Sequence, residues 1–397
     1  MSTHRGIRPR EIALLAAVIL VALWIVANLW PVRVPPADTF PQALLAHMEA
    51  LPDCHCGSGT MYAPSDSHRY RDYTPAHLMP VGFSERAFHL FERRHVRAYI
   101  DWWNVDEGLL PFAPELSDEM LRRALTHMRL SAQNVTLSQV HLALAVGSET
   151  DRRRPCGLLD RLAETAGTEE ALTEALASAI PDHECYLVIG ADLTTGEVRL
   201  AMPGIHGEEG LWGAFPIAVI DLHLTSYRFD TDHDPRAYVE RLWPQVNHRV
   251  LSERAEMAQR LVRSDLLISP SSLAPMTPEE TARSNQAALE RAQLPLLETE
   301  EESIAVPETL GGALEDLMGE RWPEALQCAI ASAAGCTVLG SVTETGGVGV
   351  FHVEDPARHG VWGVVPIAVF TPDQADQLAS VDWGEVADRW ERWNAAL

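Results

Sequence analysis

The sequence contains no lysine, so all 31 of its basic residues are arginines. Against them stand 56 acidic residues, which leave a formal net charge of -25 over 397 residues. Binding to nucleic acid without sequence preference requires a basic surface, and a chain this acidic does not supply one. We therefore predict no nucleic-acid partner. The use of arginine throughout indicates a GC-rich bacterial genome and carries no structural meaning by itself.

The common catalytic signatures are also missing. There is no GxSxG nucleophile elbow, HExxH zinc motif, Walker phosphate loop or dinucleotide-binding glycine pattern. The stretch GSGT at 57–60 is too short and isolated to replace one. The 16 histidines are scattered, so an active site assembled by the fold is not excluded. The sequence itself predicts no catalytic residue set and no organic cofactor.

Cysteines are few, and their even number allows disulfides in an exported chain, with 15 full pairings and no means of choosing among them. The six are Cys54, Cys56, Cys156, Cys185, Cys328 and Cys336. Cys54, His55 and Cys56 together offer soft ligands for copper or zinc. A structural metal site needs four ligands, and no second Cys/His pair with suitable spacing follows. We favour a disulfide or an ordinary loop, with a metal site at these three residues as the alternative.

One long apolar run is present, over residues 12–30, and its length suits a membrane-spanning helix. Three arginines precede it, so the positive-inside rule predicts residues 1–11 in the cytoplasm and the bulk of the chain beyond the membrane. Residues 31–44 are rich in proline and predict an extended tether. We expect an uncleaved signal anchor in the inner (cytoplasmic) membrane and a periplasmic body. A cleaved signal peptide and a buried helix are the alternatives.

The remaining chain predicts an α+β fold in which one domain is duplicated. Residues 45–150 form a mixed α/β block with a helix at 117–128 and an alternating, strand-like run at 135–146. A shift of 150 positions then aligns 190–243 with 340–393 without a gap, and GLWGAFPIAV returns as GVWGVVPIAV. Glycines, a proline and distant tryptophans stay in register, which chance similarity of two strands does not explain. We call residues 157–247 copy 1 and residues 312–397 copy 2.

Each copy predicts the order helix, three mostly antiparallel strands, helix. A Thr-Gly turn joins the first two strands, and glycine supplies the positive φ that such turns demand. The proline of the third strand cannot donate to a sheet ladder, which predicts an edge or a bulge. In copy 1 we expect Asp234 to cap the closing helix; the alternative, a calcium loop at Asp230, Asp232 and Asp234, lacks its glycine and glutamate. Residues 264–311 predict a linker with one helix, at 279–291.

Four matched tryptophans are candidate site residues. Trp212 and Trp362 stand beside glycines, where either a ligand platform or core packing would use them, and we favour core packing. Trp243 and Trp393 lie on the closing helices, where we expect each ring to be buried. Replacement of Trp393 by alanine is then expected to unfold copy 2 alone. An exposed Trp393 would instead mark a face for partner binding.

Two functions from different classes fit these patterns. The favoured one is a membrane-anchored extracytoplasmic protein–protein interaction module, such as an assembly subunit, an inhibitor or a toxin-neutralising protein. Its partner is expected to be partly basic, because residues 271–397 carry 21 acidic residues and only six arginines. The alternative is an exported hydrolase or metal-dependent enzyme that uses residues of the 54–77 region. Its candidate residues are Cys54, His55, Cys56, Ser58, His68 and His77.

Overall fold

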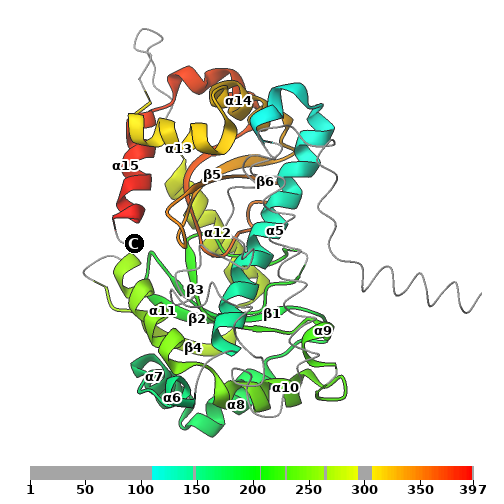
Figure 1. The fold of residues 1–397 in the computed structure, drawn as a ribbon, viewed down its shortest axis with the longest axis vertical. Coiled ribbons are helices and arrows are strands. Elements are labelled where there is room, and N and C mark those ends of the chain that lie inside the picture. The colour runs from blue at the N-terminus through cyan, green and yellow to red at the C-terminus, as the bar shows by residue number, and fades with distance from the viewer. Residues whose placement is uncertain are drawn as a thin grey trace, which may run out of the picture. The chain divides into compact units, whose positions relative to one another are not determined.

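The computed structural model describes residues 110–145, 149–205, 207–228, 230–262, 266–293 and 306–395. Within these ranges no helix is both long enough and apolar enough to cross a membrane. Residues 1–44, which were predicted as cytoplasmic segment, anchor and tether, lie outside them. No helix of the described residues supports the transmembrane helix of the predicted fold class, the predicted signal anchor or the predicted single-pass inner-membrane location, and these predictions are corrected accordingly. The described chain is a mixed α/β fold (Figure 1).

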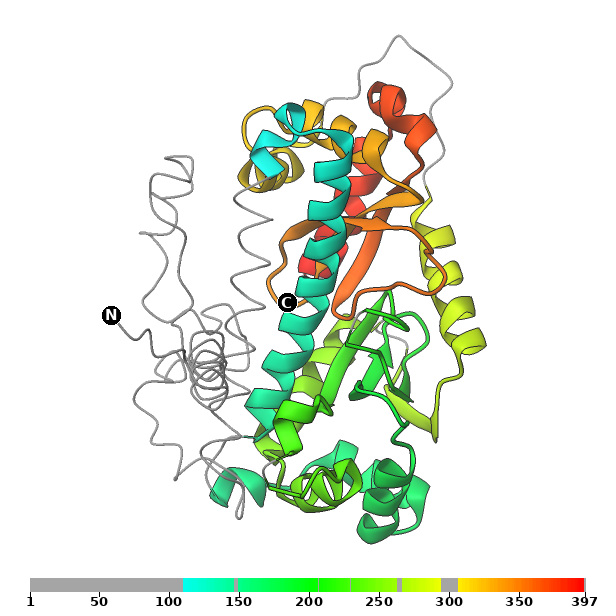
Figure 2. The same cartoon turned by 90° about the vertical axis from the view of Figure 1, so that its right-hand side faces the viewer.

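The described part begins with a short 3-10 helix, η3 (Leu110–Glu115), and a long helix, α5 (Asp118–Ala145). The predicted strand at 135–146 is wrong, because α5 continues through it. Leu137, Val140 and Leu144 repeat at spacings of three and four, and all three are buried. The helix packs on strands of both sheets described below, as Figure 2 shows. Because α5 is buried on several sides, its apolar residues do not follow one helical face, and the sequence 135–146 therefore resembles the alternation of a strand.

Two small sheets form the centre of the fold. The first contains β1 (Tyr186–Asp192), β2 (Glu197–Ala201), β3 (Ala214–Asp221) and β4 (Ser269–Pro275) in the order β3-β1-β2-β4. The second contains β5 (Cys336–Val342), β6 (Val348–Val353) and β7 (Val364–Phe370) in the order β6-β5-β7. The strands of each copy are antiparallel, and β4 adds to copy 1 in parallel with β2. The three strands of one copy thus have the order of their counterparts in the other.

The repeated proline marks an irregularity at the same place in both sheets. In copy 1 the register shifts after Ile189, where Gly190 faces Pro216. In copy 2 it shifts after Leu339, where Gly340 faces Pro366. Proline has no backbone N–H for the ladder, and the shift removes the need for that hydrogen bond. The predicted edge or bulge at the proline is therefore confirmed as a shift in register.

Short helices surround the sheets. Within copy 1 and directly next to it in sequence they are α6 (Glu149–Arg152), α7 (Gly157–Ala166), α8 (Glu169–Ser178), α9 (Leu224–Tyr227), α10 (Pro235–Leu242), η4 (Trp243–Gln245) and α11 (His248–Leu261). After β4 follow α12 (Pro278–Ala292), α13 (Glu308–Met318), α14 (Trp322–Ser332), η5 (Pro372–Ser380) and α15 (Trp383–Asn394). The Asp234 cap is confirmed, since its carboxylate accepts from the backbone N–H groups of Arg236 and Ala237. The predicted linker, 264–311, contains the strand β4 as well as α12.

The two tryptophans of the repeated segment exchange places between the copies. Trp362 comes from copy 2 but packs into the hydrophobic core of copy 1, where a side chain at Gly190 would overlap its ring. Trp212 comes from copy 1 but packs into the core of copy 2, with its ring centroid 6.0 Å from that of Phe351. Both are almost wholly buried. The repeated segment therefore fastens one copy to the other.

Backbone hydrogen bonds repeat this reciprocity. The N–H of Gly213 donates to the Val364 carbonyl at 2.9 Å, and the N–H of Gly363 donates to the Ala214 carbonyl at 2.9 Å. Both glycines have a positive φ, 66° and 77°, which places the N–H toward the opposite copy at no steric cost. The tryptophan exchange and these hydrogen bonds give the repeated Trp-Gly pair the same structural role in both copies.

The closing helices differ between the copies. α10 packs on α8, whereas α15 packs on β5 and β7, so the gapless register of the sequence does not give equal positions to the two helices. Trp243 is buried in the core of copy 1. Trp393 is half-buried and packs against both cores. A ring that contacts both copies does not support the expected selective unfolding of copy 2.

Candidate functional site

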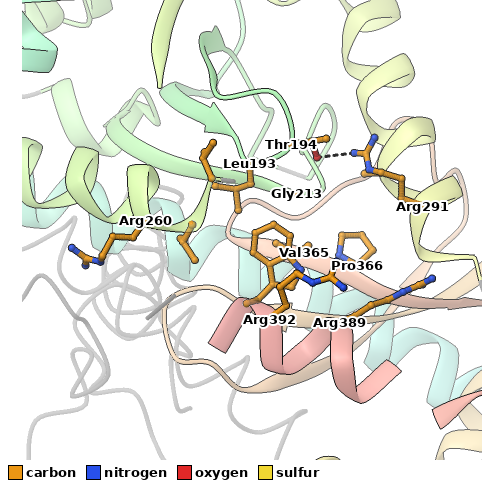
Figure 3. Close-up of a pocket in the computed structure, with 13 residues that line it drawn as sticks. Leu193, Thr194, Gly213, Arg260, Arg291, Val365, Pro366, Arg389 and Arg392 are labelled. Carbon is orange, nitrogen blue, oxygen red and sulfur yellow. Dashed lines mark hydrogen bonds between the residues drawn. The ribbon is translucent and has the colours of Figure 1, made fainter. Parts of the chain in front are cut away.

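A cavity of about 430 Å³ lies between the two copies, and we call it the inter-repeat pocket (Figure 3). Copy 1 contributes the two residues after β1 and the residue before β3, and α11, which follows copy 1, contributes its end. Copy 2 contributes β7 and α15, and α12 contributes from the segment between them. Its volume lies in the range of small-molecule sites, which also favour interfaces between structural units. The pocket is thus built from both copies and from the segment between them.

The inner surface of the pocket is mostly apolar. Its apolar lining residues are Leu193, Leu261, Val262, Ala288, Val365, Pro366 and Trp393. The half-buried Trp393 ring supplies a large flat surface, to which an apolar or aromatic group can bind. Apart from the arginines, Thr194 is the one polar side chain among the lining residues. Among the described lining residues none is acidic.

Four arginines stand around the pocket. Arg260 comes from α11, Arg291 from α12, and Arg389 and Arg392 from α15, and Figure 3 shows Arg260 and Arg291 on opposite sides of it. Arg389 is occupied, because its Nε donates to Glu385 at 2.8 Å and its Nη1 to the Ile367 carbonyl. The described residues place no carboxylate within ion-pair distance of the other three guanidinium groups.

Helix structure accounts for part of this gathering. Arg260, Arg291 and Arg392 each occupy the last turn of a helix, where a cation offsets the partial negative charge of the helix end. Yet three of the six arginines in residues 271–397 line this one cavity, in a stretch that holds 21 acidic residues. Helix ends alone would scatter arginines over the surface. Three arginines of this acidic stretch therefore line one mostly apolar cavity.

Asn285 holds the helix that carries Arg291. Its Nδ2 donates to the carbonyls of Gly210 and Ala357, both at 2.9 Å, and its Oδ1 accepts from the N–H of Trp212. The side chain is wholly buried and touches backbone from both copies. Three hydrogen bonds fix α12 against the junction, because a buried amide without partners is costly. One of the Nη2 hydrogens of Arg291 donates to Thr194 at 3.0 Å, which orients the guanidinium further.

A buried ion pair joins the copies close to the pocket. Arg254 of α11 is wholly buried, and its Nη2 lies 2.6 Å from the Glu344 carboxylate in the β5–β6 turn. Its Nε donates to the Pro216 carbonyl at 2.7 Å, and its guanidinium stacks over the Phe215 ring. This side chain connects the middle of α11, the helix that also carries Arg260, to copy 2.

The chemically suggestive residues predicted from the sequence lie elsewhere. Cys54, His55 and Cys56, with Ser58, His68 and His77, fall outside the described residues. Among the residues that are described, no three His, Cys, Asp or Glu side chains are placed to hold a metal ion. Burial raises the pKa of the Cys185 and Cys336 thiols to about 12, so neither supplies a thiolate nucleophile. The four cysteines in the described ranges are unpaired.

Of the four tryptophans predicted as candidate site residues, three lie in the cores and one lies at the pocket. Trp212, Trp362 and Trp243 are buried core residues, and Trp393 is the one of the four that lines the pocket. Sequence reasoning missed the four arginines altogether. The sequence offers one indication of them: residues 271–397 hold only six arginines among 21 acidic residues, so an arginine in this stretch is a candidate for a specific role.

Comparison with known proteins gives weak and partial similarity. No family model matches the chain. A manganese superoxide dismutase of Halobacterium salinarum is 28% identical over 183 residues, which cover 44% of this chain and 88% of that protein. Iron superoxide dismutases of Aquifex pyrophilus and Aquifex aeolicus are each 28% identical over 105 residues, or 26% of this chain, and the chain spans only 48% of their length. These relatives are metal enzymes by name, which corrects the predicted membrane-anchored interaction module; the predicted basic partner stays a prediction.

Proposed function

We propose that the chain binds a small organic anion in the inter-repeat pocket. The observation that carries this proposal is the presence of Arg260, Arg291 and Arg392 around one largely apolar cavity, with no ion-pair partner and no acidic lining residue among the described residues. Arginine presents its donors in a rigid fork that matches carboxylate, sulfonate or phosphate oxygens. Attraction is strongest where apolar walls exclude water. A small anion with an apolar part satisfies both features.

Replacement of Arg392 by glutamine is expected to weaken anion binding by about tenfold or more, because a charge-assisted hydrogen bond contributes about 1.5 kcal/mol or more. Anilinonaphthalene sulfonate is a suitable probe, since it joins an anionic group to aromatic rings and fluoresces when it is bound. Titration of the full-length chain gives its dissociation constant. Arg291→Gln is expected to act in the same direction.

Arg283→Gln is the matched control. Arg283 is an exposed arginine on α12, the helix of Arg291, and it does not line the pocket. Its loss removes the same unit of charge from the chain and should leave probe binding unchanged. Equal affinity in Arg392→Gln, Arg291→Gln and the unaltered chain would place the probe on some other apolar surface and contradict the proposal.

A metal-dependent enzyme is the second candidate, favoured by the similarity to iron and manganese superoxide dismutases. The described residues do not fit a metal, so ligands would have to come at least in part from residues 1–109 or the other segments outside the description. Cys54, His55 and Cys56 are the candidates that the sequence offers there.

Elemental analysis of the purified full-length chain tests this candidate. We expect a bound transition metal in about stoichiometric amount, and its loss when Cys54, His55 and Cys56 are replaced together by Ser, Ala and Ser; two thiolates and an imidazole favour zinc or copper over manganese. Cys328→Ser, a change in a half-buried cysteine of α14, is the control that should retain the metal. A metal-free chain would exclude the candidate, and metal retained in the triple variant would exclude these three ligands.

A further inference from the structure

We infer that the ligand of the inter-repeat pocket is a carboxylate with an apolar body, and that the pocket discriminates against polyphosphates. This inference rests on the proposed anion binding and adds the chemical class. It follows from the charge that the pocket presents, from the helix ends that form it and from the character of its walls.

The net charge at the pocket is small. Arg389 is neutralised by Glu385, which leaves the three unit charges of Arg260, Arg291 and Arg392. α11, α12 and α15 all reach the pocket through their C-terminal turns, and each helix end carries about half a negative charge. For the described residues the sum is about one and a half positive charges at most. This positive charge is balanced by one carboxylate, or two at most. A nucleoside triphosphate would bring more negative charge than the pocket can neutralise.

The backbone gives the same result. Polyphosphate sites commonly use helix N-termini or glycine loops whose free N–H groups point at the phosphates. The helical residues lining this pocket belong to C-terminal turns. The N–H of Gly213, the glycine at the pocket, already donates to the Val364 carbonyl. Binding of the anion therefore depends on guanidinium groups, which suit the planar, two-oxygen geometry of a carboxylate.

The apolar lining of the pocket favours a ligand that has an apolar part next to its carboxylate. A bare acetate would contact the arginines at the rim and leave the surface of Leu261, Val365 and Trp393 in water. An attached ring or alkyl chain covers that surface and gains the hydrophobic contribution of the buried area. Because none of the described lining residues is acidic, they offer no carboxylate to a cationic group on the ligand. Arylacetates and medium-chain fatty acids have the required chemistry, whereas amino acids do not.

The test is calorimetric titration of the full-length chain with phenylacetate, phenylacetamide, acetate and ATP. We expect phenylacetate to bind at least about tenfold more tightly than phenylacetamide, which keeps the ring but loses the charge. Acetate, which keeps the charge but loses the ring, should be weaker by a similar factor. ATP should bind no more tightly than acetate. In Arg392→Gln the advantage of phenylacetate over its amide should fall by about tenfold, and in Arg283→Gln it should persist.

The outcomes separate this inference from the proposed function. If ATP binds more tightly than phenylacetate and Arg392→Gln weakens it, the pocket binds anions but the carboxylate class is wrong. Equal binding of phenylacetate and phenylacetamide, with the sulfonate probe still dependent on Arg392, also overturns the class alone. If neither the probe nor any of the four compounds responds to Arg392→Gln or Arg291→Gln, both the class and the anion pocket are overturned.

Discussion

Replacement of Arg254 by methionine is expected to lower the free energy of unfolding by about 3–5 kcal/mol, a large part of the usual 5–15 kcal/mol of a folded domain. The guanidinium is wholly buried between the copies. Its loss leaves the Glu344 carboxylate, which is 8% exposed, without its cation, and the Pro216 carbonyl without its two donors. A buried charge that loses its partner costs far more than the pair itself contributes. Chemical denaturation at neutral pH measures the change.

Two further variants identify the cause. Arg249→Met removes another arginine of α11, one that pairs with Asp151 and Glu253 near the surface, and it should cost only about 1 kcal/mol or less. Adding Glu344→Gln to Arg254→Met should recover part of the loss, because the uncompensated charge is then removed. Equal effects of Arg254→Met and Arg249→Met would show that the pair is hydrated, and would contradict its role in fixing α11.

Local patterns in the sequence predict the repeated strands well. Glycine and proline stand at the same places in both copies, and the turn glycines Gly196 and Gly346 have nearly equal φ angles, 74° and 73°. These residues answer local needs, a positive φ or a missing N–H, which hold wherever the chain packs. The helix at 279–291 and the Asp234 cap were predictable for the same reason.

Elements that depend on distant partners were not predictable. The run 135–146 alternates like a strand because α5 is covered on several sides by both sheets, so that burial no longer follows one helical face. β4 has a Ser- and Pro-rich sequence, typical of a loop, and becomes a strand because β2 offers it a free edge. In both cases the neighbour that decides the structure lies far away in the sequence.

The candidate site shows the same limit. Arg260, Arg291 and Arg392 are 31 and 101 positions apart in order, and each reads locally as an ordinary last-turn residue of its helix. Only the junction of the copies brings them together. Cys54, His55 and Cys56, in contrast, are adjacent in sequence and form a pattern that can be recognised without the fold. Adjacency is a poor guide when a site lies between two repeats.

Because the tryptophans are exchanged, the two copies of the duplicated domain depend on each other for a complete core. Separate copies would each bury their own rings and unfold independently. Here Trp212 and Trp362 each complete the core of the opposite copy, and Arg254, Asn285 and the paired backbone hydrogen bonds cross the same junction. Each copy alone therefore has a cavity where the partner's ring should lie. We expect the two copies to fold as one cooperative unit.

Replacement of Trp362 by alanine tests this cooperativity, and we expect a loss of about 3–5 kcal/mol in a single unfolding transition. The ring belongs to the chain of copy 2, but its removal leaves the cavity in the core of copy 1, and neither core can then keep its contacts with the other. Trp393→Ala is the matched control: its ring is only half-buried, so it should cost less while it weakens binding of the apolar part of the ligand. Unfolding of both variants in denaturant is monitored by near-UV circular dichroism and by fluorescence, and limited proteolysis at the midpoint shows which fragments stay folded. Coincident curves and no surviving fragment are expected. Two separated transitions, with copy 2 surviving as a folded fragment, would show that the copies are independent and that the tryptophan exchange does not couple them.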